Sequence, residues 1–207
     1  MQLVLLMILS YLFGSISGSL LLGKFKNIDI REMGSGNAGG TNALRSVGPL
    51  FALGTIIIDI LKGYIPVILF SGYVNNNVAL AQIFFGIAAV LGHVYPIFYK
   101  FKGGKGAGTL IGVVLAIFPY SIPFVFFTWL SILIFTGFVG LSTMCAGVSL
   151  IIVTYLKYPE TLFSLFGYFT IGVGIFLFYT HRENIKRMIN GNENRFKKVM
   201  LFRKFFN

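Results

Sequence analysis

Three clusters of glycine, amide and basic residues stand at the ends of apolar segments in this chain. They run over Gly34–Arg45, Lys100–Gly106 and His181–Arg187. Backbone N–H groups of glycine-rich loops can approach a phosphate closely, and Arg and Lys add charged hydrogen-bond donors. If the three clusters face the same side of a membrane, they can hold phosphate beside lipid. This grouping is the main indication of function in the sequence.

The first cluster carries Gly34-x-Gly36-x-x-Gly39, which matches the dinucleotide-binding fingerprint. That fingerprint requires a preceding strand within a βαβ unit, whereas the flanks here are apolar spans, so we reject that function. The side chains that follow still offer donors to a phosphate, and Arg45 adds a planar fork. These other donors are Ser35, Asn37, Thr41 and Asn42. The alternative is a flexible loop of turn residues.

The second cluster reads Lys-Gly-Gly-Lys-Gly over residues 102–106. It is not a P-loop, because Tyr99 stands where the first glycine would be and Gly106 replaces the hydroxyl residue. It resembles a glycine nest with lysines at the start of a helix, a place that favours anions. The alternative is a pair of lysines that extend to the membrane interface.

The third cluster has helical spacing. His181, Asn184 and Arg187 recur every three residues, so they broadly share one face of a helix. They offer hydrogen-bond donors and one titratable imidazole to a bound anion. The alternative is a solvated helix end, where Arg and His complement the helix dipole.

Two charged residues, Asp59 and Lys62, lie three apart within an apolar segment. Charges in a membrane span usually face the bundle interior and a partner, and this spacing lets the two pair with each other. We expect them to form a structural pin near the mouth of the site rather than to catalyse. His93 lies near the end of the next span, and we expect a core histidine with satisfied hydrogen bonds.

The composition places the chain in a membrane. Its 207 residues are 56% hydrophobic and 11% charged, whereas about a quarter of the residues of a soluble domain are charged. The net charge of +11 suits anionic headgroups or a phosphorylated substrate better than nucleic acid, since the basic residues flank apolar runs and form no continuous face. Six acidic residues are too few for a metal–phosphate site, so we expect neither a metal nor a cofactor.

The apolar segments predict one all-α polytopic domain over residues 1–207 with seven transmembrane helices. A span needs roughly 20 mainly apolar residues, so the short fourth segment is expected to begin near Gly106 and to reach about Tyr120, before an outer turn at Pro119 and Pro123. Six spans remain possible if the region 109–138 is one bent span with a re-entrant piece. The expected spans are Leu3–Leu22, Leu50–Phe70, Val78–Phe98, Thr109–Phe118, Ile122–Phe138, Leu141–Leu156 and Leu162–Tyr179.

The basic residues predict the orientation. No Lys or Arg precedes Lys24, the reverse of a signal peptide, so the first segment is expected to remain as an anchor with its N-terminus outside. Of the 17 basic residues, all but Lys62 and Lys157 then fall on the inner side, as the positive-inside rule requires. The C-terminus is therefore cytoplasmic. Residues 193–207 are expected to form a basic and aromatic tail at the interface, in which Arg195–Asn207 predict an amphipathic helix lying on the inner leaflet.

Five sequence blocks resemble a known family. In chain order they are Gly34-Ser35-Gly36-Asn37 through Thr41-Asn42 and Arg45, Asp59-Ile60-Leu61-Lys62-Gly63, Gly92-His93 with Pro96, Phe101-Lys102-Gly103-Gly104-Lys105-Gly106, and His181-x-x-Asn184-Ile185-x-Arg187 with Gly191-x-Glu193. Together they resemble the bacterial membrane acyl-phosphate:glycerol-3-phosphate acyltransferases, the PlsY family. One departure is Ser17, where the family pattern leads us to expect proline.

The resemblance implies a seven-helix enzyme of the bacterial inner (plasma) membrane with its active site on the cytoplasmic face. It implies transfer of a long-chain acyl group from acyl-phosphate to the 1-hydroxyl of sn-glycerol 3-phosphate, beside membrane lipid. This is the first acylation of phospholipid biosynthesis, and it implies a functional link to the enzyme that makes acyl-phosphate from acyl carrier protein. The implied catalytic residues are Ser35, Arg45, Lys105, His181 and Asn184. The implied substrate- or phosphate-binding residues are Gly36, Asn37, Thr41, Asn42, Lys102, Gly103, Gly104, Ser142 and Arg187.

The residues suit that chemistry, because cations and amide donors can stabilise a developing oxyanion. The base is either a substrate phosphate or His181. We expect the acyl tail to lie between helices lined by small residues such as Gly86, Gly112 and Gly147. Two other functions stay open from the residues alone. They are a transporter or channel for a phosphorylated anion, and a non-catalytic binder of anionic lipid.

Overall fold

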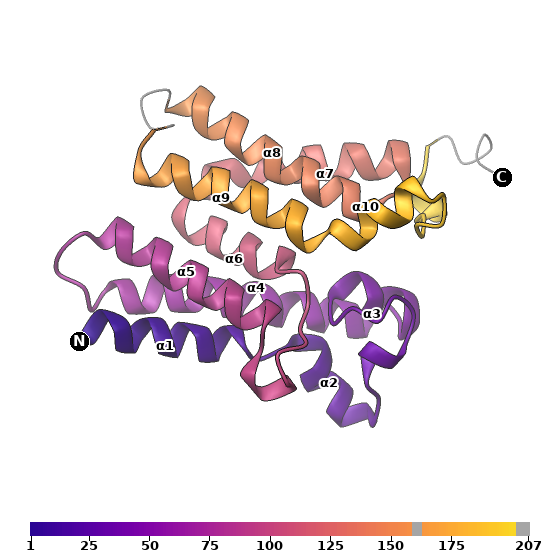
Figure 1. Ribbon diagram of the computed structural model, residues 1–207, viewed down its shortest axis with the longest axis horizontal. Coiled ribbons are helices and arrows are strands. Elements are labelled where there is room, and N and C mark those ends of the chain that lie inside the picture. The colour runs from indigo at the N-terminus through magenta and orange to yellow at the C-terminus, as the bar shows by residue number, and fades with distance from the viewer. Residues whose placement is uncertain (159–162, 202–207) are drawn as a thin grey trace. The chain divides into compact units, whose positions relative to one another are not determined.

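The computed structural model describes residues 1–158 and 163–201, and every regular element in those ranges is a helix (Figure 1). The helices group into two compact units, Met1–Pro119 and Tyr120–Asn207, and each is described by itself. The all-helical prediction is therefore confirmed for the described residues. A single domain over 1–207 stays a prediction.

The first unit is built around the long helix α4, which packs against five other helices of the unit. Pro49 opens α4 at a position where a missing N–H costs nothing, and Pro66 is accommodated inside it. Helices α1, α2, α3, α5 and α6 all contact α4, and α1 also packs along α5. The elements are α1 Gln2–Gly14, α2 Gly18–Lys26, η1 Ile30–Glu32, α3 Gly40–Ser46, α4 Pro49–Ser71, α5 Val78–Val94, η2 Ile97–Tyr99 and α6 Ala107–Ile117.

The first predicted span, Leu3–Leu22, is wrong as a continuous helix. The chain breaks between Gly14 and Gly18, and α1 and α2 meet at a bend of 44°. The break persists because its backbone groups find partners outside the helix: Lys62 Nζ donates to the carbonyl oxygen of Ile16 at 2.9 Å. The backbone N–H of Gly18 donates to Asp59 Oδ1 at 3.2 Å. Side chains of α4 thus replace the missing helical bonds.

Glycines let the helices approach each other closely. This contradicts the prediction that an acyl tail lies beside Gly86, Gly112 and Gly147. A Cβ atom on Gly112 would overlap the carbonyl oxygen of Ile60 in α4, and one on Gly86 would overlap Val113 in α6. Small residues serve this purpose in membranes, because lipid provides no hydrophobic drive for helix association. The space beside these two glycines is occupied by the neighbouring helix. The same holds for Gly147 in the second unit, where Leu177 lies 2.7 Å from a Cβ position.

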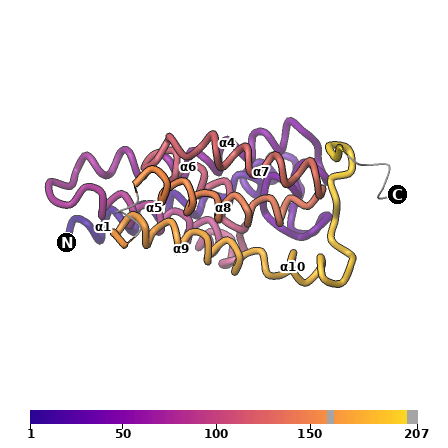
Figure 2. The backbone as a smooth tube through the Cα atoms, turned by 90° about the horizontal axis from the view of Figure 1, so that it is seen from above, coloured from indigo at the N-terminus to yellow at the C-terminus, as the bar shows by residue number. Residues whose placement is uncertain are grey.

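The second unit is a set of antiparallel helices. Helix α8 packs against both α7 and α9, and α10 contacts α8 and α9. Helix α9 runs directly into α10, after which the chain turns back (Figure 2). The elements are α7 Ile122–Thr136, α8 Val139–Lys157, α9 Leu165–Thr180, α10 Arg182–Ile189 and η5 Lys197–Val199, and the single turn η3 Pro119–Ser121 precedes α7.

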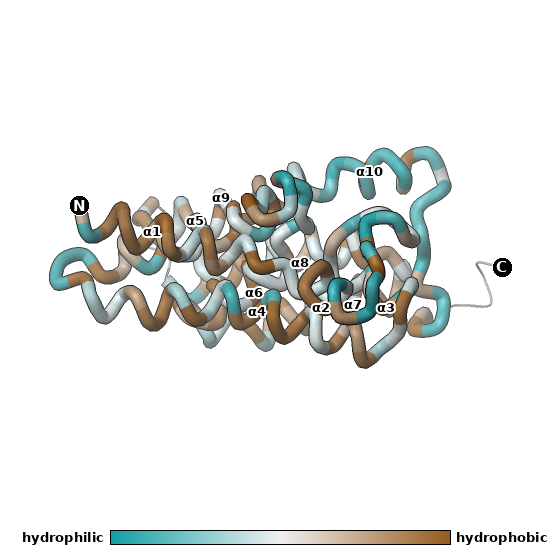
Figure 3. The backbone as a smooth tube through the Cα atoms, turned by 90° about the horizontal axis from the view of Figure 1, so that it is seen from below, coloured by the Kyte–Doolittle hydropathy of each residue, from teal (hydrophilic) through white to brown (hydrophobic). Residues whose placement is uncertain are grey.

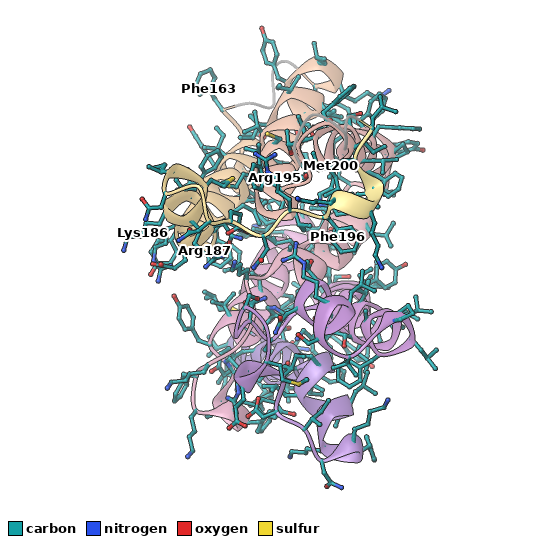
Figure 4. The ribbon with its side chains drawn as sticks, turned by 90° about the vertical axis from the view of Figure 1, so that its right-hand side faces the viewer. Phe163, Lys186, Arg187, Arg195, Phe196 and Met200 are labelled. Atoms are coloured by element: carbon teal, nitrogen blue, oxygen red, sulfur yellow. The ribbon has the colours of Figure 1, made fainter. Side chains whose placement is uncertain are left out.

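The predicted amphipathic helix over 195–207 is wrong for its described part. Residues 193–201 form an irregular segment with one short turn, and residues 202–207 lie outside the described residues. The backbone N–H of Phe196 donates to the carbonyl oxygen of Gly137 at 2.7 Å, and that of Leu201 donates to Ile134 at 3.0 Å. Apart from this turn the segment stays irregular, because two of its backbone N–H groups bond to the end of α7. Arg195, Phe196 and Met200 follow one another along it (Figure 4).

The apolar lengths confirm an integral membrane protein. Four helical segments are long and apolar enough to cross a membrane, and the bent α1–α2 pair makes a fifth. Helices α6 and α9 are apolar but shorter. Hydrophilic residues gather in α10 and the chain after it, whereas α1 is mainly hydrophobic (Figure 3). The exact number of spans and the orientation of the termini stay predictions.

Candidate active site

The side chain of Asn42, on α3, holds the first glycine cluster in shape. Its Nδ2 donates to the carbonyl oxygens of Ile30 at 3.0 Å, Met33 at 2.9 Å and Asn37 at 3.1 Å. Its Oδ1 accepts the backbone N–H of Ser35 at 2.9 Å. Asn42 is only 2% exposed. Its amide donors are engaged within the loop, so the structure gives Asn42 a positioning role.

The loop that Asn42 frames presents a few side chains outward. Gly34 and Gly36 have positive φ values of 56° and 71°, which suit glycine, and they turn the chain around Ser35. Ser35 and Gly36 are exposed, as is Arg45 in the last turn of α3. Asn37 and Thr41 are half-buried. The loop thus leaves Ser35 and Arg45 exposed at its surface.

The second cluster folds against the end of α5. The backbone N–H of Gly104 donates to the carbonyl oxygen of His93 at 3.2 Å, and that of Gly103 donates to Val94 at 3.2 Å. These two N–H groups satisfy carbonyls that a helix end leaves without partners, so they do not form a nest for an anion. Lys102 is exposed and Lys105 is half-buried, two residues before α6 begins.

The first and second clusters meet within the first unit. Gly104 is buried, and a Cβ atom there would lie 3.0 Å from the carbonyl oxygen of Ala38 in the first cluster. Its other neighbour is the imidazole of His93, which a Cβ atom would overlap. Only glycine permits this contact. It joins the segment that carries Ser35 and Arg45 to the segment that carries Lys105.

Asp59 and Lys62 form a buried ion pair beneath these loops. Lys62 Nζ lies 2.8 Å from Asp59 Oδ1, and the two side chains are 3% and 5% exposed. The same groups hold Ile16 and Gly18 at the α1–α2 break. The structure therefore gives them the role of a pin, which agrees with the spacing argument.

A second acid–base pair, which the sequence patterns did not single out, ties the loop after α2 to the turn η2. Arg31 Nη2 lies 2.6 Å from Asp29 Oδ2, and Arg31 Nη1 donates to the carbonyl oxygen of Tyr99 at 3.2 Å. Hydrogen bonds from Arg31 lower the pKa of Asp29 below its ordinary value of 3.8. A cavity of about 330 Å³ lies beside this pair, and none of the predicted site residues lines it.

In the second unit, His181 joins α9 to α10. Its Nδ1 lies 2.8 Å from the carbonyl oxygen of Leu177. A carbonyl oxygen only accepts, so we assign the proton to Nδ1, which gives Nε2 the lone pair in the neutral ring. The residue is 5% exposed. This tautomer leaves a basic nitrogen on the side of the ring away from Leu177.

Glu193 organises the third cluster, and the sequence patterns did not assign it to the site. Asn184 Nδ2 donates to Glu193 Oε1 at 2.7 Å, and Arg187 Nε donates to Glu193 Oε2 at 2.6 Å. The Glu193 side chain is 5% exposed and that of Arg187 is 32% exposed. The helical spacing of Asn184 and Arg187 does place them on a shared partner. The available signals were the Gly191-x-Glu193 block of the family resemblance and the position of a lone acid shortly after a basic helix.

Ser142, expected as a further polar contact, bonds within its own helix. Its hydroxyl donates to the carbonyl oxygen of Phe138 at 2.8 Å, and the residue is fully buried. Gly140, one half-turn earlier, lies against Asn184, which a Cβ atom would approach to 2.9 Å. In the ranges 1–158 and 163–201, no three His, Cys, Asp or Glu side chains gather as a metal site would require.

The apolar helices define a membrane protein whose loops carry clustered cations, and the comparisons with known proteins then define its family. The family model described as glycerol-3-phosphate acyltransferase matches residues 4–191. The Aquifex aeolicus (strain VF5) glycerol-3-phosphate acyltransferase is 37% identical over 198 residues, covering 95% of this chain and 100% of that protein. The Bacillus subtilis (strain 168) enzyme is 43% identical over 205 residues, covering 95% and 99%.

Solved structures agree. The crystal structure of PlsY, an integral membrane glycerol 3-phosphate acyltransferase, in its glycerol 3-phosphate form has a TM-score of 0.85 to this chain. It is 36% identical and covers 95% of this chain and 96% of its own. The lysophosphatidic acid form of that enzyme has a TM-score of 0.83 with the same identity and coverage. The chain therefore belongs to the PlsY family of membrane glycerol-3-phosphate acyltransferases, which act in phospholipid biosynthesis.

Proposed function

We propose that this enzyme transfers a long-chain acyl group from acyl-phosphate to the 1-hydroxyl of sn-glycerol 3-phosphate. The products are 1-acyl-sn-glycerol 3-phosphate (lysophosphatidic acid) and inorganic phosphate. The observation that carries the proposal is the contact between Gly104 and Ala38. It joins in one unit the loop of Ser35 and Arg45 and the loop of Lys105, two cationic segments suited to two phosphates.

The chemistry needs positioning and charge stabilisation more than a strong nucleophile. The hydroxyl oxygen attacks the acyl carbonyl carbon, the bond from that carbon to the phosphate oxygen breaks, and phosphate leaves with the electron pair. Arg45 and Lys105 offset the repulsion between the two phosphates and the charge that develops on the carbonyl oxygen. Holding the hydroxyl at the carbonyl carbon supplies the proximity term. Exposed Ser35 is proposed to contact the substrates directly.

We propose that His181, Asn184 and Arg187 also take part in the reaction. The hydroxyl proton passes to a substrate phosphate, and His181 is the rival acceptor through Nε2. His181→Gln separates the two: substantial turnover supports the phosphate, whereas collapse of kcat with unchanged substrate binding supports His181.

We further propose seven membrane crossings, which the bent α1–α2 pair and helices α4 to α9 supply. The N-terminus is then outside, and the active site faces the cytoplasm of a bacterial cell. Single cysteines at Asn76 and Lys100, placed in a Cys145→Ser background, test this with a membrane-impermeant maleimide on intact cells. Labelling at position 76 alone is expected. Labelling at position 100 alone would show the opposite orientation and refute the proposed one.

The main test is phosphate release by purified protein given palmitoyl-phosphate and glycerol 3-phosphate. Release that depends on glycerol 3-phosphate, with lysophosphatidate formed, is expected. Arg45→Ala and Lys105→Ala should abolish it, whereas Lys26→Ala, which removes an exposed cation at the end of α2, should not. Turnover with acyl-CoA but not with palmitoyl-phosphate would refute the proposal that acyl-phosphate is the donor. No turnover with either donor, in folded protein, would reopen anion transport.

The acyl-phosphate donor also implies a partner reaction. Acyl-phosphate is a mixed anhydride and must be supplied by an enzyme that transfers an acyl group to phosphate. We propose acyl carrier protein as the source of that group. Adding such an enzyme, acyl-acyl carrier protein and phosphate should replace added palmitoyl-phosphate in the assay.

A further inference from the structure

His93 is the buried polar residue that the proposed reaction does not use. It is the second-last residue of α5 and is 3% exposed. Its Nδ1 lies 3.5 Å from Asp59 Oδ1, which is long for a hydrogen bond. Among the described residues, that nitrogen is one of two buried side-chain polar atoms without a hydrogen-bond partner. The expectation of a satisfied core histidine is therefore wrong.

On one side, His93 faces the ion pair of α4. Asp59 Oδ1 is shared by Lys62 Nζ at 2.8 Å, the backbone N–H of Gly18 at 3.2 Å and the imidazole. One carboxylate oxygen thus faces three elements: α4, the start of α2 and the end of α5. A charge acts strongly in a buried, low-dielectric surrounding, so Asp59 and His93 interact across 3.5 Å by electrostatic attraction and packing, without a hydrogen bond.

On the other side, His93 supports the second glycine cluster. Its carbonyl oxygen accepts the N–H of Gly104 at 3.2 Å, and its ring lies directly under the Gly104 Cα, where a Cβ atom would overlap Nε2. Gly104 in turn lies against the Ala38 carbonyl of the first cluster. The order of contacts is therefore Asp59, His93, Gly104 and Ala38, all within the first unit.

We propose that His93 is a positioning residue for glycerol 3-phosphate binding, anchored by the Asp59–Lys62 pair. The ring keeps the backbone of Gly104 at a fixed distance from α5. Gly104 in turn fixes the position of Lys105, the next residue, relative to the loop of Ser35 and Arg45. Shrinking the ring lets Gly104 sink toward α5 and separates the two cationic loops. This inference rests on the proposed function in taking glycerol 3-phosphate as the ligand of those loops.

Two substitutions at position 93 test the proposal. His93→Ala removes both the support of Gly104 and the contact with Asp59. His93→Gln keeps a polar group within reach of Asp59 and fills part of the ring volume. The control is Thr55→Val, one turn before Asp59 on α4, because the buried Thr55 hydroxyl donates only to Phe51 of its own helix. Folding is checked by thermal unfolding in detergent.

The readouts are the Kd for glycerol 3-phosphate by calorimetry and the split between KM and kcat. His93→Ala should raise Kd and KM by about tenfold or more, since a misplacement of about 1 Å remote from the chemistry can cost up to about a hundredfold. His93→Gln should recover much of the loss, and kcat should change less than KM. Thr55→Val should match the wild type. A merely structural role would reduce the yield of folded protein and leave Kd unchanged.

Folded His93 variants with wild-type Kd and KM would overturn the proposal. If His93→Ala does not fold, His93→Gln and the double variant Asp59→Asn/Lys62→Met carry the test, because the latter removes the anchor without leaving an unpaired charge. Both should raise Kd, and wild-type Kd in both would refute the role. The proposed function fails separately, when the wild type neither binds nor acylates glycerol 3-phosphate.

Discussion

The substitution Lys62→Met tests the buried ion pair most sharply. It removes the ammonium that lies 2.8 Å from Asp59 Oδ1 and donates to the Ile16 carbonyl oxygen at 2.9 Å. Methionine is one heavy atom shorter than lysine and fills most of the same space without a charge. The change therefore leaves Asp59 buried with the Gly18 N–H and the His93 ring as its remaining partners.

Lys62→Met should lower the free energy of unfolding by a large amount, because the ion pair is buried. Both side chains are at most 5% exposed, and removing one partner of a buried pair costs about 3–5 kcal/mol. The Ile16 carbonyl also loses its donor, which adds about 1 kcal/mol. Removing both charges with Asp59→Asn/Lys62→Met should cost less than either single change, since no unpaired charge remains. The pairwise coupling should then be about 3 kcal/mol.

Unfolding titrations in mixed micelles give the four free energies of this cycle. Thr55→Val serves as the control for a buried polar group on the same helix. The reasoning is refuted if Lys62→Met costs less than about 1 kcal/mol, the size of an ordinary hydrogen bond. It is equally refuted if the double variant shows the sum of the two single losses, because additivity would mean that the two charges do not interact.

Three further changes test other contacts. Asn42→Ala removes the hydrogen bonds that frame the first cluster, so acyl transfer should collapse and stability should fall by about 1–3 kcal/mol; wild-type turnover would contradict the framing role. Glu193→Gln should weaken the hold on Arg187 and lower kcat more than Glu183→Gln, the same change at an exposed carboxylate. Arg31→Gln should lower the melting temperature at neutral pH. Because Arg31 lowers the Asp29 pKa, that deficit should persist above pH 3.8 and shrink as the pH falls further; a deficit independent of pH would refute the pairing.

Local patterns predicted much of the fold. The apolar run bounded by Gly48 and Gly72 gave α4 nearly to the residue, and a glycine loop before an apolar run located the start of α6 at Ala107. The spacing of Asp59 and Lys62 led directly to their pairing. Each of these depends on residues close in the chain, where helical periodicity and turn residues decide the outcome.

The contacts that shape the site join residues from 5 to 46 positions apart, outside the helical and turn spacings, and no pattern contained them. Asn42 looked like a donor for phosphate, but carbonyls five to twelve residues away take its amide. The N–H groups of Gly103 and Gly104 looked available, but the end of α5 takes them. The break at Ser17 follows from side chains of α4. The tertiary fold decides which acceptor each donor bonds to. The sequence therefore predicts which kinds of functional group are present, but not where they lie or which of them bind each other.

The glycines provide the last test, because the same residue type serves opposite purposes along the helices. Gly112→Ala should destabilise the protein by about 1–3 kcal/mol, since its Cβ atom would overlap the Ile60 carbonyl of α4 and backbone cannot rotate away. Gly172→Ala, on α9, is the matched control: no atom lies within 4 Å of its Cβ position, so the higher helix propensity of alanine should add about 0.5–1 kcal/mol. Unfolding titrations measure both. A stable Gly112→Ala would mean that α4 and α6 leave space between them, and the acyl tail would again have a place beside Gly112.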